Sequence, residues 1–89
     1  MGPHQIPIDG TLDLHTFRPD EARELVADYL DACREQGIYL VRIIHGKGTG
    51  SLRRLVHAVL ARHPAVERFV LDENWGATVV TLHPRQDVS

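Results

Sequence analysis

The sequence predicts an α/β domain of two layers, with the element order strand, helix, strand, helix, strand, strand. Two apolar stripes with spacings of three and four residues indicate helices, and four short β-prone runs indicate strands. Each strand–helix–strand unit should be parallel and right-handed. If each successive strand lies on the same side of the one before it, both helices therefore cover one face of the sheet and leave the other face open.

The first half of the chain supplies two strands and a helix. Leu12 and Leu14 alternate with polar residues and predict a short strand. A helix should begin at Pro19, which suits a first helical turn, and end at Gly37, which is placed as its C-terminal cap. Residues 38–44 form the second predicted strand. The apolar stripe of the helix consists of Ala22, Leu25, Val26, Tyr29, Leu30 and Cys33.

The second half repeats this pattern and adds a hairpin. A helix is predicted over residues 51–62 and stops at Pro64. Residues 66–72 form a strand, residues 73–76 form a polar turn, and residues 77–82 form the last strand. We expect one domain over residues 9–83, preceded by an extended lead-in (residues 1–8) and followed by a flexible tail (residues 84–89).

Composition excludes several classes of protein. A chain of 89 residues has room for one modest core. No apolar run approaches the ~18 residues of a membrane span, and no signal-peptide pattern opens the chain, so a cytoplasmic location is expected. A monomer is a separate expectation, which these features do not address. One cysteine excludes an internal disulfide framework and a cysteine-based zinc site. The net charge of −2 means that any nucleic-acid binding must come from a local basic patch.

A glycine-rich loop, residues 45–50, lies between the second strand and the second helix. It has three glycines in five positions, and its backbone N–H groups can point at an anion beside the helix N-terminus. His45 adds a titratable group and Lys47 a fixed positive charge. The pattern is neither a Walker A loop nor Gly-x-Gly-x-x-Gly. Such a turn is purely structural about as often as it binds a ligand, because glycine adopts positive φ at little cost.

A second group of polar side chains should lie at the same edge. His15 ends the first strand and His45 ends the second, so both fall at the carboxyl edge of the sheet. Open α/β folds bind ligands at this edge. The turn that holds Trp75 should lie near it if the last hairpin is tight.

Four segments together resemble the Smr (small MutS-related) domain. They are Leu12-Asp13-Leu14-His15, Glu21-Ala22, His45-Gly46-Lys47-Gly48 and Gly76-Ala77-Thr78-Val79-Val80. The resemblance implies a fold like the C-terminal domain of a bacterial translation initiation factor, with a mixed sheet whose fourth strand is antiparallel. It also implies endonuclease activity on DNA or RNA. Family members commonly place a glycine directly after the first motif, where this chain has Thr16. Smr domains are often appended to larger proteins, and this one is read as a stand-alone form.

The chemistry of phosphodiester cleavage assigns roles to these residues. His15 and His45 can supply acid and base near neutral pH, with Asp13 orienting a histidine. RNA offers its own 2′-OH as nucleophile, whereas DNA hydrolysis favours a metal-activated water, so a divalent cation (Mg or Mn) is a possible cofactor. We favour the metal-free RNA route. The residues expected to bind phosphate or nucleic acid are Gly46, Lys47, Gly48, Gly50, Ser51, Arg18, Arg53, Arg54 and Trp75.

Other interpretations stay open. The chain can instead be a nucleic-acid-binding module that does not cleave, or a protein-interaction domain that uses the open sheet face. Expected partners are RNA or branched or nicked DNA, and a larger repair or ribosome-associated protein. Trp75 is either a core anchor or a platform for base stacking. Among the remaining side chains, Cys33 is expected in the core, His57 and His63 in solvent, and His4 and His83 in incidental positions.

Overall fold

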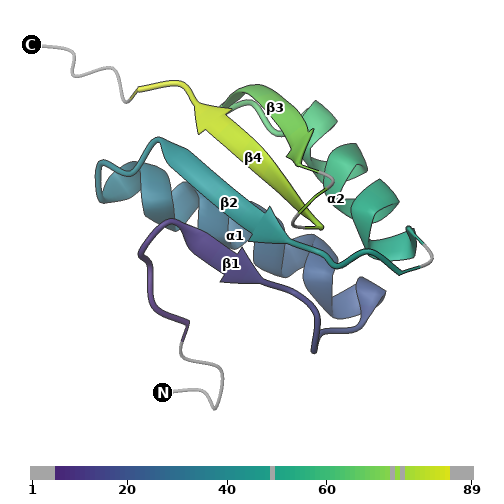
Figure 1. Cartoon of the computed structure of the whole chain (residues 1–89). Coiled ribbons are helices and arrows are strands. Elements are labelled where there is room, and N and C mark those ends of the chain that lie inside the picture. The colour runs from purple at the N-terminus through teal and green to yellow at the C-terminus, as the bar shows by residue number, and fades with distance from the viewer. Residues whose placement is uncertain (1–5, 49, 73, 75, 85–89) are drawn as a thin grey trace, which may run out of the picture.

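The computed structural model describes residues 6–48, 50–72, 74 and 76–84 of the chain. Its elements follow the predicted order (Figure 1). They are β1 (Thr11–Asp13), α1 (Pro19–Glu35), β2 (Leu40–Ile44), α2 (Ser51–Arg62), β3 (Val66–Asp72) and β4 (Ala77–Leu82). Three of the six have the predicted bounds, and β2 begins at Leu40 rather than at residue 38.

The sheet is mixed and has the strand order β1-β2-β4-β3. β1 and β2 pair in parallel, whereas β4 is antiparallel to both of its neighbours, β2 and β3. Both helices lie against the same face of the sheet (Figure 1). The predicted two-layer architecture with an antiparallel last strand is therefore confirmed. The final hairpin inserts β4 between β2 and β3, which brings the β3–β4 turn beside the end of β2.

The core lies between the sheet and the helices. Alternate residues of the strands face it, such as Leu12 on β1 and Ile43 on β2, which are 1% and 0% exposed. The predicted stripe of α1 supplies its other side, and Cys33 is fully buried there as expected. Burial also raises the pKa of the Cys33 thiol. No helix of the described part is both long and apolar enough to cross a membrane.

In the described part of the chain, no helix covers the opposite face of the sheet (Figure 1). Leu40 and Val70 remain 65% and 62% exposed there. Arg42 and Asp72 reach across this face, with 3.5 Å between Nη1 and Oδ2. The sequence prediction of an open sheet face is confirmed.

The Tyr29 hydroxyl, on α1, forms hydrogen bonds with the backbone at the start of β1. It accepts a hydrogen bond from the Gly10 N–H at 3.1 Å and lies 3.0 Å from the Thr11 carbonyl oxygen. Burial raises the pKa of the Tyr29 hydroxyl, which therefore keeps its proton for a carbonyl. The hydroxyl thus satisfies backbone groups that lie at the edge of the sheet.

Tyr29→Phe should lower the free energy of unfolding by about 1–2 kcal/mol, because the buried Gly10 N–H loses its acceptor. Thermal denaturation should show a decrease of roughly 4–8 °C for each kcal/mol in a domain of this size. Tyr39→Phe is the matched control, because Tyr39 is only partly buried and its hydroxyl forms no hydrogen bond in the described part. Equal losses in the two variants would contradict the assignment.

Candidate functional site

The glycine loop is held against the β3–β4 turn. The backbone N–H groups of His45 and Gly46 both donate to the Gly76 carbonyl, at 2.9 and 2.8 Å. Gly76 has a φ of +58°, and a Cβ at this position would lie 2.9 Å from the Gly46 carbonyl carbon. Position 76 therefore requires glycine for both its conformation and its space. The predicted approach of this turn to the carboxyl edge is confirmed, although Trp75 itself lies outside the described residues.

A small cavity opens beside the loop. It has a volume of about 280 Å³ and is lined by His45, Gly46, Lys47, Arg53, Leu71 and Gly76. Two of these side chains are cations and none is a carboxylate. The cavity thus has the charge and size expected of a site for a small anionic group such as a phosphate.

The N-terminus of α2 adds further positive charge. Gly50 is the N-cap, and the first turn holds no acidic residue. The guanidinium groups of Arg53 and Arg54 fold back toward Gly50, with Nη atoms 3.0 and 3.6 Å from the position that a Cβ there would occupy. Within the described residues, Lys47, Arg53 and Arg54 form no ion pair. These three cations near a positive helix end are unfavourable alone and favourable with a bound anion.

Asp13 and His15 form a second feature at the same edge. Asp13 Oδ1 accepts the His15 backbone N–H at 3.0 Å and lies 2.6 Å from His15 Nδ1. Partial burial works against ionisation of the Asp13 carboxyl, but the hydrogen bonds from His15 and the charge of its ring outweigh burial and lower the Asp13 pKa. A carboxylate can only accept, so His15 Nδ1 carries a proton. The His15 side chain is 66% exposed and accessible to a substrate.

His45 occupies a different environment. It is 6% exposed and turns toward the helix layer, where its Nε2 lies 2.9 Å from Thr78 Oγ1 and its Nδ1 lies 3.1 Å from the Gly46 carbonyl oxygen. Asp13 pairs with Ile44 in the sheet, so the two histidines share one edge as predicted. Strand alternation nevertheless places Asp13 and His15 on the open side and His45 on the buried side. No described contact joins the two rings, and we therefore assign them separate roles.

The prediction that His57 and His63 are solvated is wrong. His57 is partly buried, its Nε2 lies 2.8 Å from Thr78 Oγ1, and its ring packs 5.0 Å from that of Phe69. The His63 side chain is only 9% exposed, and its Nε2 lies 3.1 Å from Asp31 Oδ1. Both histidines stand on or directly after α2, and their sequence neighbours did not indicate the partners, which come from β4, β3 and α1.

None of the remaining predicted residues that the structure describes lines the small cavity. Arg18 caps α1 at the edge that holds His15, but its guanidinium is already paired with Asp20 at 3.3 Å. Gly48 is exposed, and a Cβ there would meet nothing within 4 Å. Ser51 is the first residue of α2. His83 is exposed, as expected of an incidental position, and His4 lies outside the described residues.

The described residues fit a divalent cation poorly. Mg²⁺ prefers several oxygen ligands, and Asp13 is the only carboxylate in the proposed catalytic pair. In the part of the chain that the structure describes, no three His, Cys, Asp or Glu residues lie close enough to hold a metal ion. We derive no step through a metal, and the cation stays a prediction.

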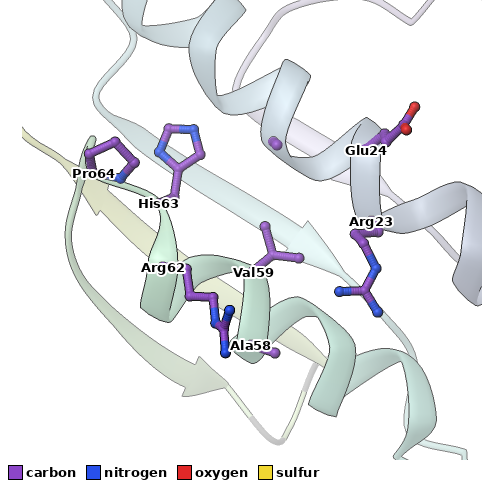
Figure 2. A pocket seen from close by; sticks show the side chains of 8 residues that line it. Arg23, Glu24, Ala58, Val59, Arg62, His63 and Pro64 are labelled. Carbon is purple, nitrogen blue, oxygen red and sulfur yellow. The ribbon is translucent and has the colours of Figure 1, made fainter.

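A larger cavity lies elsewhere, between α1 and α2 (Figure 2). Its volume is about 510 Å³, and it contains no residue of the glycine loop. Its lining is mostly apolar surface, bordered by the exposed charged side chains of Arg23, Glu24 and Arg62. The other lining residues are Ala27, Ala58, Val59, His63 and Pro64. We place the candidate site at the carboxyl edge of the sheet, which holds both the cationic loop with its smaller cavity and the Asp13–His15 pair; these two residues do not line the cavity themselves.

Gly76→Ala should lower the free energy of unfolding by roughly 2–3 kcal/mol, because alanine is strained at positive φ and its Cβ would collide with the Gly46 backbone. Thermal denaturation should show a decrease of at least ~8 °C. Gly37→Ala is the matched control: Gly37 has a φ of +79°, but a Cβ there would meet nothing within 4 Å. Losses of equal size would contradict the close-approach argument.

The chain resembles known proteins over most of its length. The family model of the Smr domain matches residues 12–83. The endonuclease MutS2 of Pelotomaculum thermopropionicum is 44% identical and that of Thermomicrobium roseum 37% identical, each over 79 residues. Each match covers 84% of this chain and 10% of the relative, so the chain spans about a tenth of the length of these curated proteins. The crystal structure of the Smr domain of Thermus thermophilus MutS2 matches with a TM-score of 0.78 and 35% identity, covering 85% of this chain and 100% of that chain.

Proposed function

Because the chain belongs to the Smr domain family, and because its carboxyl edge holds both an exposed Asp13–His15 pair and a cationic loop, we propose that it is a nucleic-acid-binding endonuclease. The proposal rests above all on the 2.6 Å contact between Asp13 Oδ1 and His15 Nδ1. It presents an oriented, solvent-accessible imidazole at the sheet edge where phosphate would bind.

The glycine loop binds the phosphate in this proposal. Lys47 and Arg53 line the cavity, and Arg54 lies beside the same helix N-terminus. The backbone N–H groups of Gly48 and Gly50 form no hydrogen bond in the described part and remain available to an anion. The local charge therefore attracts a nucleic-acid backbone although the chain as a whole has a net charge of −2.

His15 is the proposed proton-transfer group. Its Nε2 takes the proton from a nucleophile while Asp13 stabilises the imidazolium that forms. In RNA the nucleophile is the 2′-OH adjacent to the scissile phosphate. Its attack forms a cyclic 2′,3′-phosphate and breaks the P–O5′ bond, and the imidazolium returns the proton to the departing oxygen. This route needs only groups that the chain and the RNA supply, so RNA is the favoured substrate.

A non-cleaving nucleic-acid-binding module is the second candidate. The burial of His45 favours it, because only one of the two predicted catalytic histidines is left accessible to substrate. Both candidates use the same loop and differ at His15. Branched or nicked DNA with a divalent cation, and a larger repair or ribosome-associated partner, are further proposals in which this domain acts at the same site.

His15→Ala and Asp13→Asn should each reduce cleavage of labelled single-stranded RNA by about 10²–10⁴-fold, the usual contribution of a general acid or base. Binding of the same RNA should be nearly unchanged. Branched DNA, with and without Mn²⁺, is assayed in parallel by gel electrophoresis. His83→Ala is the matched control, because His83 is an exposed histidine outside the site. If the wild-type protein leaves every substrate intact, the nuclease proposal fails.

Removal of a loop cation should weaken RNA binding in a salt-dependent way. For Lys47→Ala and for Arg53→Ala, the slope of log K against log salt concentration should become shallower by about 0.7, the value for one phosphate contact on a single strand. Arg62→Ala is the control, because Arg62 is an exposed cation in the last turn of the same helix. An identical slope in all four proteins, measured by fluorescence anisotropy, would remove the loop from the interface.

A further inference from the structure

The side chains of His45, Thr78 and His57 form a hydrogen-bond network next to the glycine loop, in which the first two are buried and His57 is partly buried. Thr78 Oγ1 lies 2.9 Å from His45 Nε2 and 2.8 Å from His57 Nε2. The side chains come from the end of β2, from β4 and from α2. Thr78 is fully buried and His45 is 6% exposed. The two rings are 6.1 Å apart between centroids, so the hydroxyl links groups that do not bond directly.

If both histidine rings are neutral, donor and acceptor rules determine the direction of each of these hydrogen bonds. The Gly46 carbonyl can only accept, so the His45 Nδ1, 3.1 Å away, carries the proton. The His45 Nε2 is then an acceptor, and the Thr78 hydroxyl must donate to it. A hydroxyl has one proton, so Thr78 Oγ1 accepts from the His57 Nε2–H. Burial, the largest cause, together with the charge of Arg53, lowers the pKa of His57 and favours its neutral ring.

We propose that Thr78 and His57 are positioning residues, which hold His45 as the Nδ1–H tautomer so that its ring fixes the Gly46 carbonyl and the conformation of the glycine loop. The Gly46 peptide groups are then held from two sides. The Gly46 N–H donates to the Gly76 carbonyl at 2.8 Å, and the Gly46 carbonyl accepts from His45. The tautomer depends on the fold alone, whereas its effect on phosphate binding rests on the proposed function.

The role of the hydroxyl can be separated from its packing. Valine has nearly the shape of threonine, so Thr78→Val preserves volume and leaves ring nitrogens of His45 and His57 without their partner. Thr78→Ser keeps the hydroxyl and loses a methyl group. Thr81→Val is the matched control on the same strand, because Thr81 is only partly buried and lies on the open side of the sheet.

The first readout is the tautomer itself, from long-range ¹H–¹⁵N correlation spectra of the histidine rings. In the wild type, His45 should show a protonated Nδ1 and an unprotonated Nε2, and His57 a protonated Nε2. Thr78→Val should turn His45 into a mixture of tautomers, whereas Thr78→Ser and Thr81→Val should keep the wild-type pattern. A purely structural role of Thr78 would change stability without changing these ring signals.

A second pair of variants tests His57. His57→Gln keeps an N–H donor near the position of Nε2, and His57→Leu removes it. His45 should keep its tautomer in the first variant and lose it in the second. Affinity for a single-stranded RNA oligonucleotide should fall about tenfold in Thr78→Val and His57→Leu, the usual effect of losing one buried hydrogen bond, and stay near the wild-type value in the other variants.

The outcomes separate the two levels of the proposal. A wild-type His45 with its proton on Nε2, or with both nitrogens protonated, overturns it, and so does a Thr78→Val protein that keeps the wild-type tautomer. If Thr78→Val does not fold, the wild-type spectrum and the His57 pair decide. The expected tautomers in a wild-type protein that binds neither RNA nor branched DNA would support the positioning network and refute the proposed function.

Discussion

The double hydrogen bond to the Gly76 carbonyl is the interaction on which the site depends. It joins the end of β2 to the turn before β4, and it forms because β4 inserts between β2 and β3. The resulting contact is so close that residue 76 has no room for a side chain. The loop that leaves β2 is therefore fixed to the sheet at His45 and Gly46, and it leads directly to the N-terminus of α2. A site on such an edge keeps its geometry before a ligand arrives.

The two histidines of the family motifs, His15 and His45, suit different roles at this edge of the sheet. His15 is exposed and tied to a carboxylate, which suits a group that exchanges protons with a substrate. His45 is buried and bonded to a hydroxyl and a carbonyl, which suits a group that holds the backbone. The difference follows from strand alternation, because neighbouring strands of one sheet can present their last side chains to opposite faces.

Local charge, rather than total charge, defines the proposed ligand. The chain carries a net charge of −2, yet Lys47, Arg53 and Arg54 gather near one helix N-terminus without an ion-pair partner in the described part. Like charges at the positive end of a helix repel one another and cost stability. A bound phosphate would relieve this repulsion, and its binding would be favoured by the same amount. The cavity between α1 and α2 is a weaker candidate for this ligand, because its lining is mostly apolar.

The sequence by itself determined the elements and most of the candidate residues. The spacing of Leu25, Leu30 and their neighbours predicted α1, the alternation around Leu12 predicted β1, and the two motifs placed His15 and His45 at one edge. Only the tertiary structure decided what these side chains touch. The bonds of His57 and His45 to Thr78 join residues 21 and 33 positions apart, and no local pattern records such a contact. Periodicity indicates which face of its own element a residue occupies. Its partner on another strand or helix depends on the spatial order of the strands in the sheet.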